Sequence, residues 1–102
     1  MSHFIQVATV GELAPDQMKR IKVQHKKLLL VYANDAYYAV DEICSHEDYS
    51  LYLGCIQDGK IKCSLHGSYF DLKTGKALIE PADQPIQTYP VKIEQDIIYV
   101  DA

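Results

Sequence analysis

Two short segments each carry one cysteine and one histidine, and these four side chains have the types and spacing that could do chemistry. Cys44-Ser45-His46 is followed, after sixteen residues, by Cys63-Ser64-Leu65-His66. Gly54 and Gly67 lie in or beside the two segments, where sharp turns of the backbone are expected. Two thiolates and two imidazoles suit either a tetrahedral zinc ion or an iron–sulfur cluster with mixed ligands.

The order of the ligands within each segment separates these two chemistries. Zinc sites with two cysteines and two histidines usually place cysteine beside cysteine and histidine beside histidine, with the histidines on a helix. Here each segment has cysteine first and histidine second, and no helical pattern surrounds His66. The order therefore favours a [2Fe–2S] cluster that has two cysteine and two histidine ligands, and zinc stays open as the alternative.

The whole motif, Cys-x-His, sixteen residues and then Cys-x-x-His, resembles that of the Rieske-type ferredoxins of bacterial aromatic-ring dioxygenase systems. The likeness covers roughly residues 3 to 101 and is strongest over residues 41 to 92. It extends beyond the motif to three further stretches, namely His66 to Leu78, Pro81-Ala82 and Tyr89-Pro90-Val91.

The resemblance implies one Rieske-type [2Fe–2S] cluster and a role for each ligand. Cys44 and Cys63 would bind the inner iron, and His46 and His66 would bind the outer iron near the surface. The implied protein is a soluble one-electron carrier without catalytic residues, and so not an enzyme. Its implied donor is a flavin-containing ferredoxin reductase, and its implied acceptor is a terminal Rieske non-haem iron oxygenase.

Other Rieske proteins differ from this chain. Those of cytochrome complexes carry a membrane anchor and an extra cysteine in each cluster loop, whereas here Ser64 and Leu65 occupy the second loop and Cys55 has no partner. Terminal oxygenases need a further iron domain, for which 102 residues leave no room. The small Rieske-like subunit of assimilatory nitrite reductase stays an alternative, as does a less favoured zinc-stabilised interaction module.

The residues after His66 bear on the reduction potential. In high-potential relatives, Ser and Tyr stand two and four residues after the second histidine ligand and donate hydrogen bonds to the cluster. This chain has Ser68 at the first place but Phe70 at the second, and Phe has no hydroxyl group. We therefore expect a potential nearer about −150 than about +300 mV, at the low end of the Rieske range.

Five residues near the motif carry less specific signals. Cys55 lies between Gly and Ile and is expected to be a small buried hydrophobe. Leu51 and Leu65 are expected to pack over the cluster, to form an apolar docking patch, or to do both. Glu47 and Asp48 directly follow His46, where they would either steer a partner or belong to a solvated loop.

The chain that positions these residues has 102 residues, 48% hydrophobic and 24% charged. This predicts one globular domain over residues 1–102, with the cluster-binding region at about 42–70. The longest apolar run, Leu28 to Ala33, is far shorter than the about 20 residues of a membrane-spanning helix. The N-terminus lacks a secretory signal, so we expect the cytoplasm. A net charge of −4 without charge blocks argues against nucleic-acid and membrane partners.

Short apolar or alternating runs separated by turns predict an all-β sandwich or barrel. The resemblance narrows this to a Rieske-type antiparallel β-sandwich with a small cluster-binding subdomain of two loops. Strands are expected at residues 4–10, 18–24, 28–32, 36–41, about 60–62, 69–72, 77–79, 88–93 and 97–100. Turns are expected at 26–27, 33–35, 73–76 with Gly75 at positive φ, and 94–96; residues 11–15 break the first strand and allow one helical turn.

Overall fold

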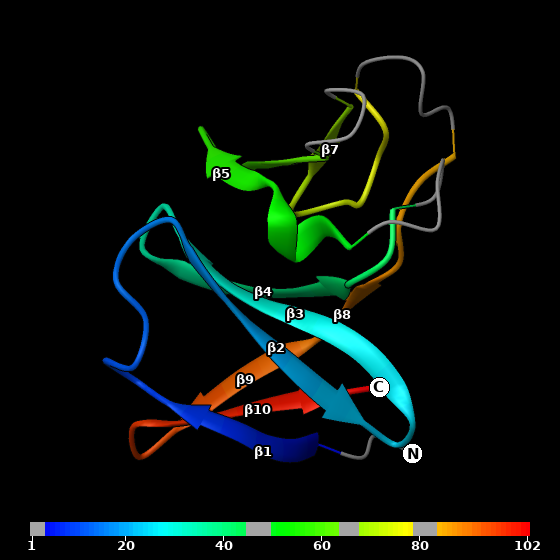
Figure 1. Ribbon diagram of the computed structural model, residues 1–102. Helices are drawn as coiled ribbons and strands as arrows, with labels where there is room; N and C mark the ends of the chain where they lie inside the picture. Colours follow the sequence, from blue (N-terminus) through cyan, green and yellow to red (C-terminus); the bar gives the residue numbers. More distant parts are fainter. Residues whose placement is uncertain (1–3, 45–49, 64–67, 79–83) are drawn as a thin grey trace.

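The computed structural model describes residues 4–44, 50–63, 68–78 and 84–102. Within these residues the chain is built of antiparallel β-strands and one turn of 3₁₀ helix, η1 (Figure 1). The elements are β1 (Phe4–Thr9), β2 (Gln17–Val23), β3 (Lys26–Ala33), β4 (Ala36–Asp41), η1 (Leu51–Leu53), β5 (Cys55–Gln57), β6 (Lys60–Lys62), β7 (Tyr69–Asp71), β8 (Thr88–Tyr89), β9 (Val91–Glu94) and β10 (Ile97–Asp101). No helix in the described ranges is long and apolar enough to cross a membrane.

Three sheets form three layers, and the four-stranded sheet β2-β3-β4-β8 is the middle one. Figure 1 shows the three-stranded sheet β1-β10-β9 on one side of it and the small sheet β5-β6-β7 on the other. The predicted all-β sandwich is confirmed, and the cluster-binding subdomain contains a small sheet in addition to its loops. We call residues 42–86 the upper subdomain and the two larger sheets the base.

Strand β3 shows why the longest apolar run of the sequence lies where it does. Successive side chains of a strand point to opposite faces of the sheet. Leu28 and Leu30 therefore pack into the core between the two large sheets, together with Val100 of β10. Leu29 and Val31 pack on the opposite face, in the apolar cluster shared with the upper subdomain. Because both faces of β3 are covered, the strand needs apolar residues without interruption.

Two-residue turns with positive φ connect most of the hairpins, which is the geometry of type I′ turns. Such turns occur at Asn34-Asp35 and Gln95-Asp96, within the predicted turns, and at Asp58-Gly59 between β5 and β6. The turn predicted at Lys26-Lys27 is wrong: those lysines begin β3, and the turn is Gln24-His25, with φ of 49° and 72°. The lysines looked like a turn because both side chains face solvent.

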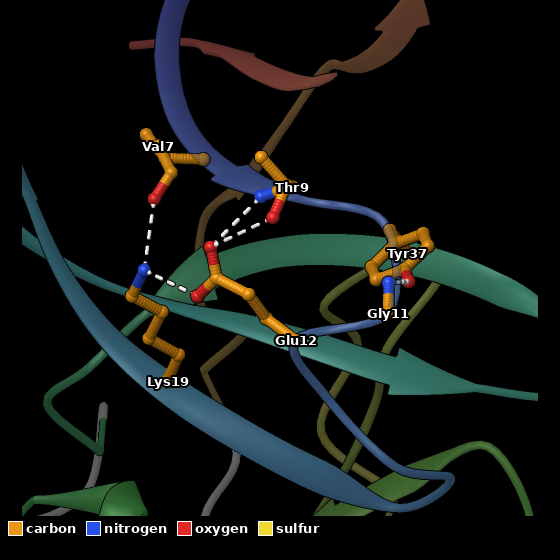
Figure 2. Close-up of polar contacts among 6 residues, drawn as sticks. All are labelled: Val7, Thr9, Gly11, Glu12, Lys19 and Tyr37. Carbon is orange, nitrogen blue, oxygen red and sulfur yellow. Dashed lines mark hydrogen bonds and ion pairs between the residues drawn. The ribbon is translucent and has the colours of Figure 1, made fainter. Parts of the chain in front are cut away.

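The connection between β1 and β2 contains no helical turn among its described residues, and Glu12 holds it instead (Figure 2). One carboxylate oxygen of Glu12 accepts from the backbone N–H of Thr9 at 2.9 Å, and the other lies 2.9 Å from Lys19 Nζ. The hydrogen bond from Lys19, followed by that from Thr9, lowers the pKa of Glu12. The Nζ of Lys19 also donates to the carbonyl of Val7 at 3.1 Å, so Lys19 ties β2 to β1.

Candidate metal centre

The two motif cysteines are buried thiols in one apolar cluster. Cys44 is 3% exposed and Cys63 is 1% exposed, and neither takes part in a disulfide. The cluster also contains Leu51 and Phe70, both fully buried, and side chains from the upper face of β3. Apolar side chains of both the base and the upper subdomain therefore surround the two cysteines.

The first segment is closed at its base by the backbone. Ile43 and Ser50 form an antiparallel bridge, and the N–H of Leu51 donates to the carbonyl of Glu42 at 2.7 Å. Ser50 then begins η1, because its side chain accepts a hydrogen bond from the N–H of Tyr52 at 3.2 Å. The two ends of the first segment, at Ile43 and Ser50, therefore lie side by side.

The second segment is closed in a similar way. Lys62 of β6 pairs with Tyr69 of β7. At the next position toward the loop, the N–H of Cys63 donates to the carbonyl of Ser68 at 2.7 Å. The small sheet β5-β6-β7 therefore holds the second segment as the connection of a β-hairpin. The pairing of β6 with β7 therefore fixes the backbone of Cys63.

Gly54, which follows η1, brings the chain that leaves the first segment against Lys62, the residue before Cys63. A Cβ atom built on Gly54 would overlap the carbonyl of Lys62, so no side chain fits at this contact. Gly54 also donates its N–H to the carbonyl of Leu51 at 2.9 Å, which ends η1. The two segments that carry the motif are thereby held side by side.

Several predicted residues fall outside the described ranges, namely His46, His66, Leu65, Glu47 and Asp48. The prediction that Leu51 forms part of a docking patch is wrong, since Leu51 is fully buried; its other predicted role, in packing, agrees with its place beside the two cysteines.

The prediction that Cys55 is buried is also wrong, because the thiol of Cys55 is exposed. Strand alternation explains this: Ile56 faces the core, so its neighbours Cys55 and Gln57 face solvent. Gly75 has the predicted positive φ, at 79°.

The donor set fits a positively charged metal centre. Cysteine binds metals as the thiolate, and burial of two thiolates in an apolar cluster is costly unless a positive centre compensates their charge. The sequence places one imidazole two or three residues after each buried thiol. Two thiolates and two imidazoles on two adjoining segments match the ligand set of a Rieske [2Fe–2S] cluster.

Sequence reasoning missed two acids that stand directly before the first segment. Asp41 accepts from the hydroxyl of Tyr89 at 2.7 Å and from the N–H of Gln87 at 3.0 Å. These bonds connect the end of β4 to β8. Glu42 accepts from the hydroxyl of Ser50 at 2.7 Å. An acid beside a turn is usually a solvated residue, so the sequence carries no signal for either role.

Comparison with known proteins decides the family. The model of the Rieske [2Fe–2S] domain matches residues 3–90. The chain belongs to this family. It is 34% identical to the ferredoxin component of biphenyl 2,3-dioxygenase from Rhodococcus jostii (strain RHA1), over 94% of this chain and 90% of the relative. The likeness therefore spans nearly the full length of both chains.

Solved structures agree with the family and the fold. The ferredoxin of carbazole 1,9a-dioxygenase from Nocardioides aromaticivorans IC177 has a TM-score of 0.92 and 30% identity, and the match covers 97% of each chain. A complex of reduced oxygenase and oxidised ferredoxin in carbazole 1,9a-dioxygenase gives a TM-score of 0.89 and 26% identity, with 94% of this chain and 99% of that chain covered.

These findings confirm the cofactor and the class of function that the sequence predicts. The protein is a Rieske-type electron carrier with one [2Fe–2S] cluster, an electron-transfer component and not a catalytic subunit. The matches favour this function over the two alternatives, a subunit of nitrite reductase and a zinc-stabilised module.

Proposed function

We propose that this protein is the ferredoxin of a multicomponent aromatic-ring dioxygenase system and works in the cytoplasm as a single domain. It accepts one electron at a time from a flavin-containing ferredoxin reductase and passes it to a terminal Rieske non-haem iron oxygenase. The observation that carries the proposal is the burial of Cys44 and Cys63 in one apolar cluster, at the closed bases of two adjoining segments. The names of its relatives and the solved ferredoxin–oxygenase complex support the oxygenase as a partner. The reductase rests on the family resemblance.

The proposed ligands are Cys44, His46, Cys63 and His66. When bound, the [2Fe–2S] cluster takes up and releases one electron. The two thiolates would hold the inner iron within the apolar cluster that also contains the fully buried Leu51 and Phe70. The two imidazoles would hold the outer iron, as the family resemblance implies, and would give partners the shorter route to the cluster.

The chain's own contribution is a scaffold that keeps the ligands in place while the charge of the site changes. The backbone bonds Leu51 N–H to Glu42 and Cys63 N–H to Ser68, both 2.7 Å long, close the two segments independently of the cofactor. Such preorganisation limits the rearrangement that accompanies the gain or loss of an electron.

Stopped-flow reduction and reoxidation test the proposed function. The cluster-loaded chain is mixed with NADH and a flavin-containing ferredoxin reductase of an aromatic-ring dioxygenase system, and then with the oxidised terminal oxygenase of that system. We expect reduction that needs the reductase, followed by rapid reoxidation that needs the oxygenase. A loaded chain that exchanges electrons with neither protein, but transfers them to a nitrite reductase large subunit, would contradict the proposal.

A further inference from the structure

Glu42 is the one charged residue of the described ranges that is classed as buried, with 8% exposure. It stands between the last residue of β4 and the bridge residue Ile43, two positions before Cys44. Its carbonyl accepts the N–H of Leu51 at 2.7 Å, and its own N–H donates to the carbonyl of Lys27 in β3 at 3.1 Å. The backbone of Glu42 therefore joins the base of the molecule to both ends of the first ligand segment.

The side chain of Glu42 also connects the first segment to the central sheet. Its Oε2 accepts from the hydroxyl of Ser50 at 2.7 Å, and the same oxygen lies 3.3 Å from Nε of Arg20 in β2. The hydroxyl oxygen of Ser50 in turn accepts from the N–H of Tyr52. A single carboxylate oxygen thus connects the start of the segment to its end, and both to the central sheet.

The contributions of these two partners differ. The side chain of Arg20 is 54% exposed and its carbon Cζ lies 4.6 Å from the centre of the Tyr52 ring. Solvent screens an ion pair with such a partner, so it contributes little. The bond from Ser50 is short, part-buried and made to a charged acceptor, which is the stronger kind of hydrogen bond. The Ser50–Glu42 bond is therefore the contact that fixes the segment.

We propose that Glu42 is a positioning residue for the [2Fe–2S] cluster, and that it acts through Ser50 to hold the first ligand segment closed around Cys44. This rests on the ligand assignment proposed above. Groups that hold metal ligands in orientation typically account for a factor of 10–100 in metal affinity. Loss of the Ser50–Glu42 bond should accelerate release of iron about tenfold, which corresponds to about 1.4 kcal/mol.

Three variants separate the hydrogen bond from the charge. Glu42→Ala removes both, Ser50→Ala removes the bond and keeps the charge, and Glu42→Gln removes the charge and keeps an acceptor for the Ser50 hydroxyl. Glu12→Ala is the matched control, since Glu12 also binds a backbone N–H, a hydroxyl and a cation, but in the β1–β2 connection (Figure 2).

Two measurements on the cluster-loaded proteins test whether the Ser50–Glu42 bond helps to retain the cluster. Both are made below the melting temperature of every variant. The first is the rate of iron transfer to a chelator, and the second is the paramagnetic resonance spectrum of the reduced protein. We expect Glu42→Ala and Ser50→Ala to release iron about ten times faster and to show an altered spectrum. Glu42→Gln keeps a neutral and therefore weaker acceptor, so it should release iron at a rate between those of the wild type and Glu42→Ala. Glu12→Ala should match the wild type in both measurements.

The inference is overturned if Ser50→Ala and Glu42→Ala keep the wild-type rate and spectrum, or if Glu12→Ala accelerates release as much as they do. If Glu12→Ala also accelerates release, faster loss of iron reflects lower stability of the whole domain and not the Ser50–Glu42 bond. A wild-type protein that binds neither iron nor sulfide would instead overturn the ligand assignment itself. The two failures are therefore distinguishable.

Discussion

Gly54 and the carbonyl of Lys62 are in direct backbone contact, and this contact joins the two segments that carry the cluster motif. The backbone of Gly54 has φ of −89°, a value that any residue adopts, so glycine is required here by space and not by conformation. Because Lys62 immediately precedes Cys63, a displacement at Gly54 moves the second thiol relative to the first.

Gly54→Ala is therefore expected to force the two segments apart. The new methyl group would meet backbone atoms, which cannot rotate away, and overpacking of this kind typically costs about 1–3 kcal/mol. We expect a lower iron content and a lower melting temperature. Gly11→Ala is the control: it strains a backbone with φ of 99° in the β1–β2 connection but meets no atom within 4 Å. It should lower the melting temperature and keep full iron content. Equal iron contents in both variants would show that the contact at Lys62 does not position the cluster.

Cys63→Ser should give a colourless protein of lower stability, because a bound metal centre contributes to folding through its ligands. Each kcal/mol lost should lower the melting temperature of a domain of this size by about 4–8 °C. Cys55→Ser is the matched control, because Cys55 is the exposed cysteine of the three and lies on β5. Iron analysis and thermal melting check both variants. Retention of full iron content by Cys63→Ser would remove Cys63 from the ligand set.

Phe70→Tyr should raise the reduction potential. Phe70 is fully buried in the apolar cluster that contains Cys44 and Cys63. A hydroxyl group that donates to the cluster stabilises the more negative, reduced form. A hydrogen bond that stabilises the reduced form over the oxidised form by about 1.4 kcal/mol raises a one-electron potential by roughly 60 mV. Phe70→Leu, which changes packing without adding a donor, should show no such rise. A variant with intact spectrum and an unchanged potential, measured by voltammetry, would contradict this role.

Tyr89→Phe should lower stability at neutral pH by about 1 kcal/mol, through loss of the bond to Asp41. Burial, and then the hydrogen bond to Asp41, raise the pKa of Tyr89 above its ordinary value of 10.0. The stabilisation is therefore complete below about pH 10 and declines at higher pH, where the unfolded chain loses the phenol proton first. The difference between the wild type and Tyr89→Phe should shrink above about pH 10.

Denaturant unfolding at several pH values checks the prediction for Tyr89. Tyr38→Phe on β4 is the control, because the hydroxyl of Tyr38 makes no hydrogen bond to the described part of the chain. A stability difference that stays constant from pH 8 to pH 11 would show that the Tyr89–Asp41 bond is not linked to the phenol proton.

Partner association should depend on charge near the first segment. The net charge is −4, and Glu47 and Asp48 directly follow His46. Charges at the rim of an interface act mainly on the rate of association. Reduction by the reductase should therefore slow as salt rises from about 0.01 to 0.15 M, where the Debye length falls from about 30 to 8 Å.

The double variant Glu47→Lys with Asp48→Lys should slow reduction further at low salt. Glu94→Lys with Asp96→Lys makes the same change in net charge around the β9–β10 turn, far from β5-β6-β7 (Figure 1). Stopped-flow rates that respond equally to both pairs would show that overall charge, and not the first segment, directs the encounter.

The sequence predicted those features that depend on local pattern. The strand at residues 28–32, the turn around Asn34-Asp35 and the positive φ of Gly75 follow from apolar runs and turn chemistry, and all three are confirmed. Ala33, predicted as part of the turn, ends strand β3. The motif spacing predicted the cofactor, because the ligand order of a Rieske cluster is specific.

The features that the sequence did not predict depend on packing between distant segments. Strand β5 is only three residues long and is defined by its pairing with β6. In this strand the side chain of Cys55 faces solvent. Leu51 is buried because η1 turns it into the apolar cluster of Cys44 and Cys63. The role of Glu42 depends on Ser50, eight residues away, and on Arg20 in another strand, and no local pattern encodes either contact.

Chemical analysis of the purified protein, together with a reductive titration, tests the central claim most directly. The account predicts two iron and two sulfide ions per chain, and uptake of one electron that produces a paramagnetic signal in the reduced form. A chain that holds one zinc ion and no sulfide, or that takes up no electron, would contradict it.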